Sequence, residues 1–428
     1  MTLHKSAERT TSAASERWPG LDVVPSGPRA AISARIARRL FTAAVNRLDV
    51  TVLLHHEDGV RQLGRGGPTA IVYRPDEFFA RIGRHQLIGF GEAYLTGAWD
   101  EGPDGDLGGF LAVLAAEISD LVPRSLQRFR TVVAKRPPGR QKSSKKNSQA
   151  NIAHHYDLSN DLFELFLDPS LSYSAALFAG DPALARREDL EEAQYRKIDR
   201  MLDEVGVGQG TRLLEIGSGW GALAIRAARR GATVRTVTLS VEQKQLADQR
   251  IAAAGLSDRI SVEICDYRDL KGSYDAIVSV EMIEAVGWQY WRTYFETLDR
   301  VLAPGGRVCV QAITMPHDRM LATRNTYTWI HKYIFPGGML PSLDAIDDVT
   351  RSHTALRMQT PFSLGLHYVP TLRFWDEAFL EQSDAVRALG FDETFMRMWH
   401  FYLEYSRAGF QSGYIGDYQL TFSREDGA

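Results

Sequence analysis

The chain has 428 residues, of which 44% are hydrophobic and 24% are charged, and its formal net charge is −3. These values are typical of a globular protein with one large or two modest domains, and the charge argues against a dedicated nucleic-acid binder. The two cysteines exclude a disulfide framework and fit a reducing cytoplasm, and no apolar run approaches the ~20 residues that span a bilayer.

The first predicted elements belong to an N-terminal domain over residues 29–130, which follows a flexible leader at 1–28 rich in Ser, Thr, Ala, Pro and Gly. Residues 30–48 are expected to form a helix with Ile32, Ile36 and Leu40 on one face and arginines mostly elsewhere. A basic amphipathic helix of this kind either docks on anionic lipid or packs on its own domain, and both interpretations stay open.

The rest of this N-terminal domain shows mixed patterns that assign it no reaction. Strands are expected at 50–55 and 70–74, the glycines and aromatics of 83–99 suggest a packed turn, and 107–122 is typical of a helix. From 124 to 146 there are nine lysines and arginines and no acid, so a flexible basic linker is predicted at 131–150. This linker is either a solvated hinge or a segment attracted to anionic phospholipid.

Strands and helices alternate in the next part of the chain. Helices are expected at 151–163, 190–205, 220–230, 241–254 and 288–303, and strands at 212–217, 233–239, 260–265, 275–280 and 307–314. Such alternation predicts a mostly parallel sheet with helices on both faces and a ligand at the carboxyl ends of the strands. Cys265 and Cys309 fall in these strand-like runs and are expected to be buried free thiols.

The segment 213–221, Leu-Leu-Glu-Ile-Gly-Ser-Gly-Trp-Gly, runs from a buried strand through a glycine turn into a helix. NAD enzymes use a similar device, but the spacing here is not Gly-x-Gly-x-x-Gly. Glu215 lies inside the strand end, and the next strand ends in Thr-Leu-Ser rather than in the lone acid that holds an NAD ribose. The segment instead resembles the S-adenosylmethionine-binding motif of the class I methyltransferases.

After residue 314 the alternation stops. Helices are expected at 319–332, 371–389 and 392–409, with a turn at 333–338 and a final strand at 414–423. Aromatic side chains are frequent in these segments: Tyr327, Trp329, Tyr333, Phe335, Phe374, Trp375, Phe379, Trp399, Phe401, Tyr402 and Phe410. Aromatic residues at helical spacing are usually core, and a channel for a long apolar substrate beside the cofactor cleft is the alternative.

Several motifs, in the order in which they occur, resemble the cyclopropane-fatty-acyl-phospholipid synthase family. They are His155-Tyr156-Asp157-Leu158-Ser159-Asn160 and the segments 214–221, 238–243, 266–269 and 333–338. The run 89–94 is also similar to that family, and 279–287 and 311–317 resemble its actinobacterial branch. The resemblance implies an α/β fold: a class I methyltransferase Rossmann-like sheet with helical and aromatic cap insertions over 151–428, preceded by a smaller α+β N-terminal domain associated with lipid.

The resemblance also implies which residues hold S-adenosylmethionine, and it implies no metal. The matching positions are Tyr173 and Ser174 beside the cofactor, Glu215 with Gly217, Gly219 and Gly221 at the methionine moiety, Thr238, Leu239 and Gln243 at the ribose, and Asp266 and Tyr267 at the adenine edge. An amide and a hydroxyl suit ribose hydroxyls, and aromatic faces attract a sulfonium.

The reaction centre matches the family only in part. The family holds a bicarbonate ion as general base with a Cys, a Glu, a His, a backbone Ile and a Tyr. Glu284, Ile313 and Tyr368 match, whereas Ala175 and Gln311 replace the Cys and the His, and Ser406 aligns with a second family Cys. Gln311 can hydrogen-bond an anion but cannot change protonation, so bicarbonate binding stays open. Glu284, Tyr368 or a bound anion is expected to act as the base.

The implied reaction is transfer of a methyl group from S-adenosylmethionine to the cis double bond of an oleoyl phospholipid, giving a 10-methylene chain that is a precursor of tuberculostearate. Ring closure to a cyclopropane is the first alternative. A small-molecule methyltransferase and a non-catalytic homologue that binds lipid or cofactor are more distant ones. The expected partners are the phospholipid surface at the inner face of the membrane, a separate oxidoreductase that reduces the methylene product, and a second copy in a homodimer.

Overall fold

The computed structural model describes residues 18–121 and 159–425 of the chain. The predicted linker at 131–150, most of the predicted leader and the His155-Tyr156-Asp157-Leu158 part of the family motif lie outside the described residues. Two compact units are present, unit 1 over residues 1–134 and 390–412 and unit 2 over 135–389 and 413–428. In the described ranges, no helix has the length and apolar character needed to cross a membrane.

Unit 1 contains a small mixed sheet with the strand order β2-β1-β3-β4, covered by helices. Its strands are β1 (Thr51–His56), β2 (Gly59–Leu63), β3 (Thr69–Val72) and β4 (Trp99–Glu101), and its helices are α2 (Pro28–Val45), α3 (Pro75–His85), α4 (Leu87–Leu95), α5 (Leu107–Leu121) and α20 (Glu393–Gln411). The predicted helix at 30–48 and strands at 50–55 and 70–74 are confirmed. Strand β2 was not predicted because four of its five residues are exposed, so it lacks an apolar alternation.

The prediction of a packed turn at 83–99 is wrong, because this segment contains the end of α3 and the whole of α4. Gln86, with a φ of 54°, separates the two helices. A Cβ atom on Gly89 would lie 2.0 Å from the carbonyl oxygen of Arg81, so this glycine lets α4 touch the backbone of α3. The glycines that suggested a turn therefore serve close helix packing.

Helix α20 belongs to unit 1 although it begins about 270 residues after the end of α5. Its Arg397 donates to the Asp100 carboxylate at 3.1 Å, and its Glu404 accepts from the backbone N–H of Gly108 at 2.8 Å. The Phe401 ring lies 5.1 Å from the ring of Tyr94. The expected domain over 151–428 therefore differs from the structure at this helix, whose aromatic side chains form part of the unit 1 core.

Unit 2 is built on the expected large sheet, with the order β10-β12-β9-β8-β5-β6-β7 and a short β11 paired to β12. The neighbours from β9 through β7 run parallel, and β12 is antiparallel to β9. The strands are β5 (Arg212–Ile216), β6 (Thr233–Thr238), β7 (Ile260–Ile264), β8 (Tyr274–Val280), β9 (Leu302–Thr314), β10 (Leu356–Met358), β11 (Phe362–Ser363) and β12 (Gly416–Arg424). The predicted alternation is confirmed.

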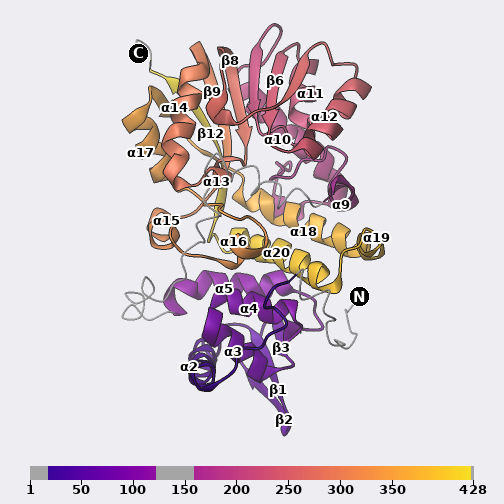
Figure 1. Ribbon diagram of the computed structural model, residues 1–428, viewed down its shortest axis with the longest axis vertical. Coiled ribbons are helices and arrows are strands. Elements are labelled where there is room, and N and C mark those ends of the chain that lie inside the picture. Colours follow the sequence, from indigo (N-terminus) through magenta and orange to yellow (C-terminus); the bar gives the residue numbers. More distant parts are fainter. Residues whose placement is uncertain (1–17, 122–158, 426–428) are drawn as a thin grey trace. The chain divides into compact units, whose positions relative to one another are not determined.

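Helices cover both faces of this sheet, as Figure 1 shows. They include α9 (Asn160–Phe166), α10 (Leu190–Glu204), α11 (Ala222–Arg229), α12 (Val241–Ala253) and α14 (Trp291–Val301). One core cluster contains Tyr294 and Phe295 from α14, and the other contains Met201 and Ala224 from α10 and α11. The buried strands are thus apolar on both faces, which explains why they appear in the sequence as continuous hydrophobic runs.

The segments after β9 are more broken than predicted. The single helix expected at 319–332 is two short ones, α15 (His317–Thr323) and α16 (Trp329–Tyr333), because the Thr328 side chain caps a new helix start. The helix expected at 371–389 is α18 (Gly365–Glu381) followed by α19 (Ser383–Ala388). Helix α17 (Leu343–His353), capped by the Ser342 hydroxyl, was not predicted.

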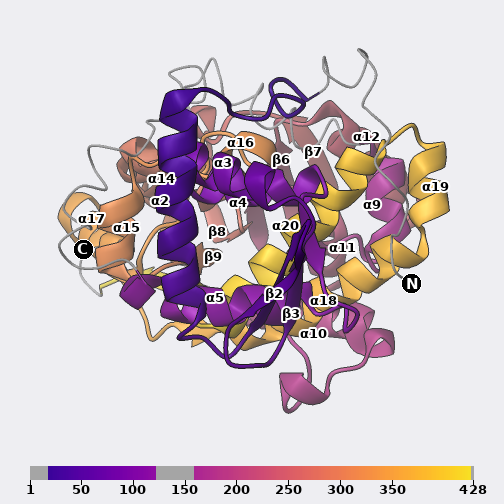
Figure 2. The same ribbon diagram turned by 90° about the horizontal axis from the view of Figure 1, so that it is seen from below.

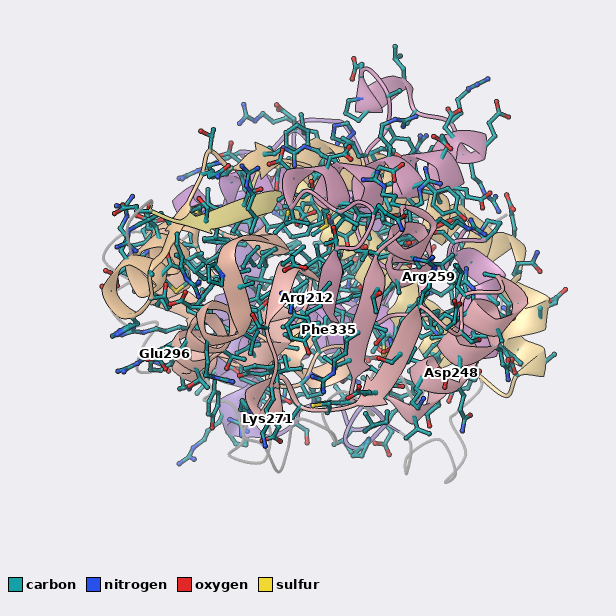
Figure 3. All side chains as sticks on the ribbon, turned by 90° about the horizontal axis from the view of Figure 1, so that it is seen from above. Arg212, Asp248, Arg259, Lys271, Glu296 and Phe335 are labelled. Atoms are coloured by element: carbon teal, nitrogen blue, oxygen red, sulfur yellow. The ribbon has the colours of Figure 1, made fainter. Side chains whose placement is uncertain are left out.

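The unit 2 sheet has different residues at the edge formed by the amino-terminal ends of its parallel strands and at the edge formed by their carboxyl ends. Arg212 begins β5 and pairs with Asp275 of β8 at 2.7 Å, and Figure 3 shows Arg212 at this amino-terminal edge. The opposite edge holds the carboxyl ends of β5, β6 and β8, which continue into the glycine turn, residues 238–240 and Glu281. This second edge is where a ligand of a parallel sheet is expected.

Candidate active site

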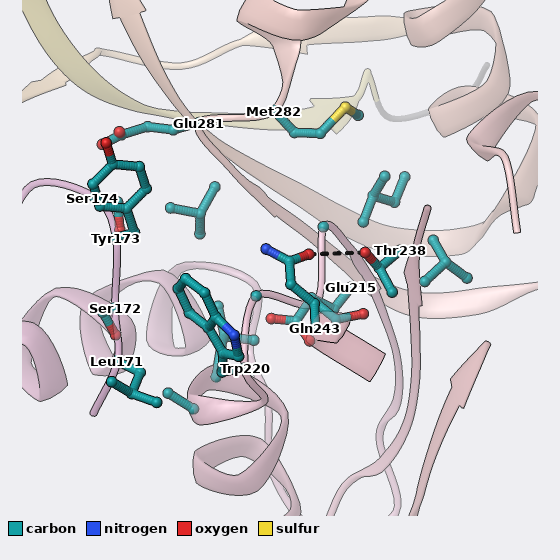
Figure 4. Close-up of a pocket in the computed structure, with 18 of the residues that line it drawn as sticks. Leu171, Ser172, Tyr173, Ser174, Glu215, Trp220, Thr238, Gln243, Glu281 and Met282 are labelled. Carbon is teal, nitrogen blue, oxygen red and sulfur yellow. Dashed lines mark hydrogen bonds between the residues drawn. The ribbon is translucent and has the colours of Figure 1, made fainter. Parts of the chain in front are cut away.

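A cavity of about 190 Å³ lies at the carboxyl ends of β5, β6 and β8 in unit 2, and Figure 4 shows several of its lining side chains. Most of the predicted cofactor residues line it: Tyr173, Ser174, Glu215, Gly217, Gly219, Thr238, Leu239, Gln243 and Tyr267. Two predicted residues do not: Gly221, which is the N-cap residue just before α11, and Asp266. The Asp266 carboxylate is instead held by the Arg268 guanidinium at 2.6 and 2.7 Å.

The glycine turn folds as its sequence predicts. Gly217, Gly219 and Gly221 have φ values of 96°, 47° and 88°, which side-chain-bearing residues rarely adopt. The backbone N–H of Gly217 donates to Val237 at 2.9 Å, which ties the turn to β6. A Cβ atom on Gly219 would meet nothing within 4 Å, so the backbone there faces open space. The turn therefore leaves room for a ligand to approach the main chain.

Glu215 is an acidic residue that lines the cavity. The residue is 3% exposed, and its Oε2 atom is buried without a hydrogen-bond partner among the described residues. Burial raises the pKa of Glu215 to about 8, although a hydrogen bond with Thr236 and the charge of Lys197 act in the other direction. An orphaned buried carboxyl of this kind suits a cationic ligand that pairs with it.

The polar wall beside Glu215 is built from β6 and α12. The Thr238 hydroxyl donates to Gln243 Oε1 at 2.9 Å and accepts from the Ser240 N–H at 3.1 Å. The Ser240 hydroxyl accepts from the backbone N–H of Gln243 and so caps α12. Since Thr238 uses the amide oxygen of Gln243, the amide nitrogen is left as the hydrogen-bonding group that this side chain presents.

Aromatic side chains form the other wall. The ring of Tyr173 lies 5.2 Å from that of Trp375 and 5.1 Å from that of Phe163, all within unit 2. Trp220 lines the cavity, and its indole N–H donates to Asn160 Oδ1 at 2.8 Å. Asn160 closes the family motif that begins at His155, so this contact gives that residue a supporting role. The aromatic residues of α18 are core, as the more common interpretation predicted.

The four residues expected at the reaction centre lie beside the cavity and do not line it. The backbone N–H of Ile313 donates to Glu284 Oε1 at 2.5 Å, while Glu284 Oε2 is buried without a partner among the described residues. Burial raises the pKa of Glu284 to about 8, and the neighbouring Glu281 raises it further. Tyr368 and Gln311 both donate to Glu281, which therefore joins this group to the cavity.

Three site residues were missed by the sequence prediction: Glu281, Lys197 and Asp417. Glu281 and Lys197 line the cavity, and Asp417 is fully buried on β12, where it accepts from Gln311 Nε2 at 3.0 Å. Lys197 is 1% exposed and donates to the Ser174 hydroxyl at 2.5 Å, and burial lowers its pKa. Lys197 could have been found from the sequence, because it is a lysine on the buried face of α10.

The thiols and possible metal ligands add little to the site. Cys309 is buried, as predicted, but Cys265 is only half-buried and lines the cavity. Burial raises the pKa of the Cys265 thiol, so it is not an activated nucleophile. Within residues 18–121 and 159–425, no group of three or more His, Cys, Asp or Glu side chains is placed to hold a metal ion.

Comparison with known proteins gives matches over the whole chain. Residues 143–420 match the family model described as mycolic acid cyclopropane synthetase. The chain is 50% identical over 428 residues, 99% of both chains, to the tuberculostearic acid methyltransferase UfaA1 of Mycobacterium tuberculosis. It is 34% identical over 358 residues, 83% of this chain and 88% of the other, to the cyclopropane-fatty-acyl-phospholipid synthase of Escherichia coli K12.

Solved structures resemble about two thirds of the chain. The cyclopropane synthase MmaA2 of Mycobacterium tuberculosis gives a TM-score of 0.59 at 30% identity, covering 64% of this chain and 98% of that protein. The mycolic acid cyclopropane synthase CmaA1, complexed with SAH and CTAB, gives 0.58 at 31% identity, covering 64% and 97%. These matches confirm the predicted α/β fold with a methyltransferase sheet.

Proposed function

Because the chain belongs to the mycolic acid cyclopropane synthetase family, the relationship that its motifs predict, we propose that it methylates the cis double bond of an oleoyl phospholipid. The chain is an S-adenosylmethionine-dependent methyltransferase. The proposed product is a 10-methylene acyl chain. The observation that carries this choice of product is the 50% identity, over the full length of both chains, with a tuberculostearic acid methyltransferase.

The cavity supports the cofactor part of the proposal. S-adenosylmethionine supplies the methyl group and carries an ammonium and a sulfonium, and the cavity offers the orphaned carboxyl of Glu215 together with the rings of Tyr173 and Trp220. We propose that the ammonium pairs with Glu215, that the methionine moiety lies against the glycine turn, and that the ribose hydroxyls bind Gln243. Aromatic faces attract a sulfonium, and a carboxylate in a low-dielectric site attracts an ammonium strongly.

The surroundings of the cavity suit a cationic reaction. Methyl transfer to one alkene carbon leaves a cation on the other, and water must be kept from it. Tyr173 lines the cavity, and its ring packs on the buried rings of Phe163 and Trp375, so this side of the cavity is apolar. A hydride shift moves the cation to the methylated carbon, and loss of a proton from the new methyl group leaves its electron pair as the C=C bond of the methylene branch. A base beside the cavity has to accept that proton.

Helix α2 supports an encounter with a membrane surface. Its outward face carries Ile32, Ile36 and Leu40, which are 60%, 56% and 51% exposed, and Figure 2 shows α2 lying across α3 in unit 1. The helix contains four arginines and no acid. Burying the exposed part of each apolar side chain in lipid contributes on the order of 1 kcal/mol, and each basic residue at an anionic surface adds about as much.

Ring closure to a cyclopropane is the second candidate, because the chain is also 34% identical to a cyclopropane-fatty-acyl-phospholipid synthase. The two reactions share the methyl transfer and differ in which bond the last electron pair forms. A methylene product would then need a separate oxidoreductase to become a methyl branch.

The test is mass spectrometry of the fatty acids from an oleate-containing host that expresses this protein alone. Methylene and cyclopropane C19 chains have the same mass, so the products are also hydrogenated and derivatised to locate double bonds. A C19 chain that mild hydrogenation reduces to a 10-methyl branch is the expected result. A C19 chain that resists hydrogenation would establish the cyclopropane alternative, and no C19 chain would overturn both.

Membrane binding is tested by sedimentation with vesicles of phosphatidylglycerol and of phosphatidylcholine. The wild type is expected to sediment with the anionic vesicles, and Ile36→Glu is expected to remain in solution. Val60→Glu is the matched control, because Val60 is 57% exposed on β2 of the same unit. Equal loss of binding in both variants would contradict a role for the α2 face.

A further inference from the structure

Glu281 occupies an unusual position at the edge of the cavity. It directly follows β8 and has a φ of 48°, and only two other described residues besides glycine, Gln86 and Leu171, have a positive φ. Leu171 also lines the cavity. A bulky residue in the left-handed region is disfavoured and persists where the surrounding structure holds it, which is common at functional sites. The backbone N–H of Glu281 donates to the Gln311 carbonyl at 2.8 Å, which fixes this geometry.

Three donors from three different segments converge on the Glu281 carboxylate. The Tyr368 hydroxyl of α18 donates to Oε2 at 2.7 Å, and the backbone N–H of Ala175 and the Gln311 side-chain amide of β9 each donate to Oε1 at 2.9 Å. A carboxylate has about four acceptor positions, so these donors leave capacity for one more proton. Figure 4 shows Glu281 among the cavity residues, on the side where Tyr173 and Ser174 lie.

The Gln311 amide cannot turn round to serve another ligand. Its oxygen accepts from Gln419 Nε2 at 3.2 Å, and its nitrogen donates both to Glu281 and to Asp417 Oδ2 at 3.0 Å. The Gln419 oxygen in turn accepts from Arg200 at 2.7 Å. Every hydrogen-bonding atom of the Gln311 side chain is thus engaged, and its amide nitrogen faces the Glu281 carboxylate.

These contacts bear on the bicarbonate ion that the family relationship implies. The positions expected to hold it include 175, 311 and 368, and at each of them the available donor already binds the Glu281 carboxylate. Glu284, a further expected position, does not line the cavity and binds the Ile313 N–H. The residues present therefore do not fit a separate bicarbonate, because the Glu281 carboxylate already accepts the hydrogen bonds that would bind it.

We propose that Glu281 is the general base of this enzyme and that its carboxylate makes an exogenous bicarbonate unnecessary. The inference rests on the proposed methyl transfer to an acyl double bond. A C–H bond of the transferred methyl group breaks, its electron pair forms the new C=C bond, and the proton moves to a Glu281 oxygen and later to solvent. Burial raises the pKa of Glu281, which makes its carboxylate a better proton acceptor than an exposed one.

The test uses purified full-length protein, S-adenosylmethionine and dioleoyl phosphatidylglycerol vesicles in buffer stripped of carbon dioxide. The wild type is expected to be as active there as with added bicarbonate. Glu281→Gln keeps the shape of the side chain and removes the proton acceptor, so kcat should fall by about 100-fold or more. Glu296→Gln, on the exposed face of α14, is the control and should leave kcat unchanged.

A second variant separates the loss of the base from a general defect. Glu281→Gly relieves the positive φ and empties the carboxylate position, so added bicarbonate or formate should restore part of its activity. The same anions should not rescue Glu281→Gln, whose amide still fills the position. Nuclear magnetic resonance of ¹³C-labelled bicarbonate gives a readout that needs no turnover: the signal should broaden with Glu281→Gly and stay sharp with the wild type.

Three results would overturn the inference: bicarbonate-dependent activity of the wild type, broadening of the labelled signal by the wild type, or a kcat of Glu281→Gln near that of the wild type. A failure of the proposed function looks different, since the wild type would then give no C19 product with or without bicarbonate. Cofactor titration of each variant checks that the cavity is intact.

Discussion

Glu215 should lose a proton when S-adenosylmethionine binds. At pH 7 a carboxyl with a pKa of about 8 is about 90% protonated, so an ammonium that pairs with it must first displace the proton. Binding of S-adenosylmethionine to the wild type should therefore release about 0.9 proton through this group at pH 7. The affinity for S-adenosylmethionine should also rise with pH, because removing the proton from Glu215 costs less free energy at higher pH.

The size of that rise follows from the same pKa. Between pH 6 and pH 7 the ionised fraction of Glu215 grows about ninefold, so Kd should fall about ninefold, or by about 1.3 kcal/mol. In Glu215→Gln the proton release should drop by about 0.9 and Kd should rise by about tenfold or more, because a charged partner is lost. Glu284→Gln is the matched control, since Glu284 also has a pKa of about 8 but does not line the cavity.

The assay is isothermal titration calorimetry of S-adenosylmethionine in two buffers of different ionisation enthalpy, at pH 6 and at pH 7. The difference in apparent enthalpy between the buffers gives the number of protons released. Equal release by the wild type and Glu215→Gln, or loss of release in Glu284→Gln, would refute the pairing of Glu215 with the ligand ammonium.

Three predictions concern stability. The folded-state pKa of Glu284 is raised to about 8, so between pH 4.5 and pH 8 the folded protein binds more protons than the unfolded chain. The free energy of unfolding should therefore fall by up to about 5 kcal/mol as the pH rises from 4.5 to 8. Glu284→Gln should flatten this dependence in thermal melts at several pH values. Gly89→Ala should cost about 1–3 kcal/mol in urea unfolding because of its clash with α3, whereas Gly208→Ala, with open space around it, should change stability by less than about 0.5 kcal/mol. Arg407→Met leaves the buried Glu404 carboxylate without its cation and should cost about 3–5 kcal/mol, against less than about 1 kcal/mol for Arg38→Met at an exposed pair, again by urea unfolding.

The parts of the site that lie close together along the chain could be predicted from the sequence. The glycine turn at 217–221 and the run from Thr238 to Gln243 each follow a strand, and the carboxyl ends of neighbouring parallel strands meet at one edge. Their positions therefore followed from the alternation of strands and helices. Asp266 follows a strand in the same way, but it pairs with Arg268 and does not line the cavity, and no sequence pattern indicates that pairing.

The parts that depend on distant contacts could not be predicted. The role of Glu281 depends on donors at 175, 311 and 368 and on one backbone torsion, none of which leaves a periodic signal. Helix α20 has the same aromatic character as α18, so its pattern does not reveal that it packs in unit 1. Gly89 shows the converse problem, since a glycine that permits helix packing looks the same in sequence as one that forms a turn.

The location of α20 in unit 1 has a consequence for biosynthesis. The ribosome makes the first part of unit 1 and then has to add about 280 further residues before the last turn of α20 can join it. At 5–20 residues per second this interval is about 15–55 s. During that time α4 and α5 lack the helix that packs on them, so the nascent chain should depend on chaperones until almost the whole message has been translated.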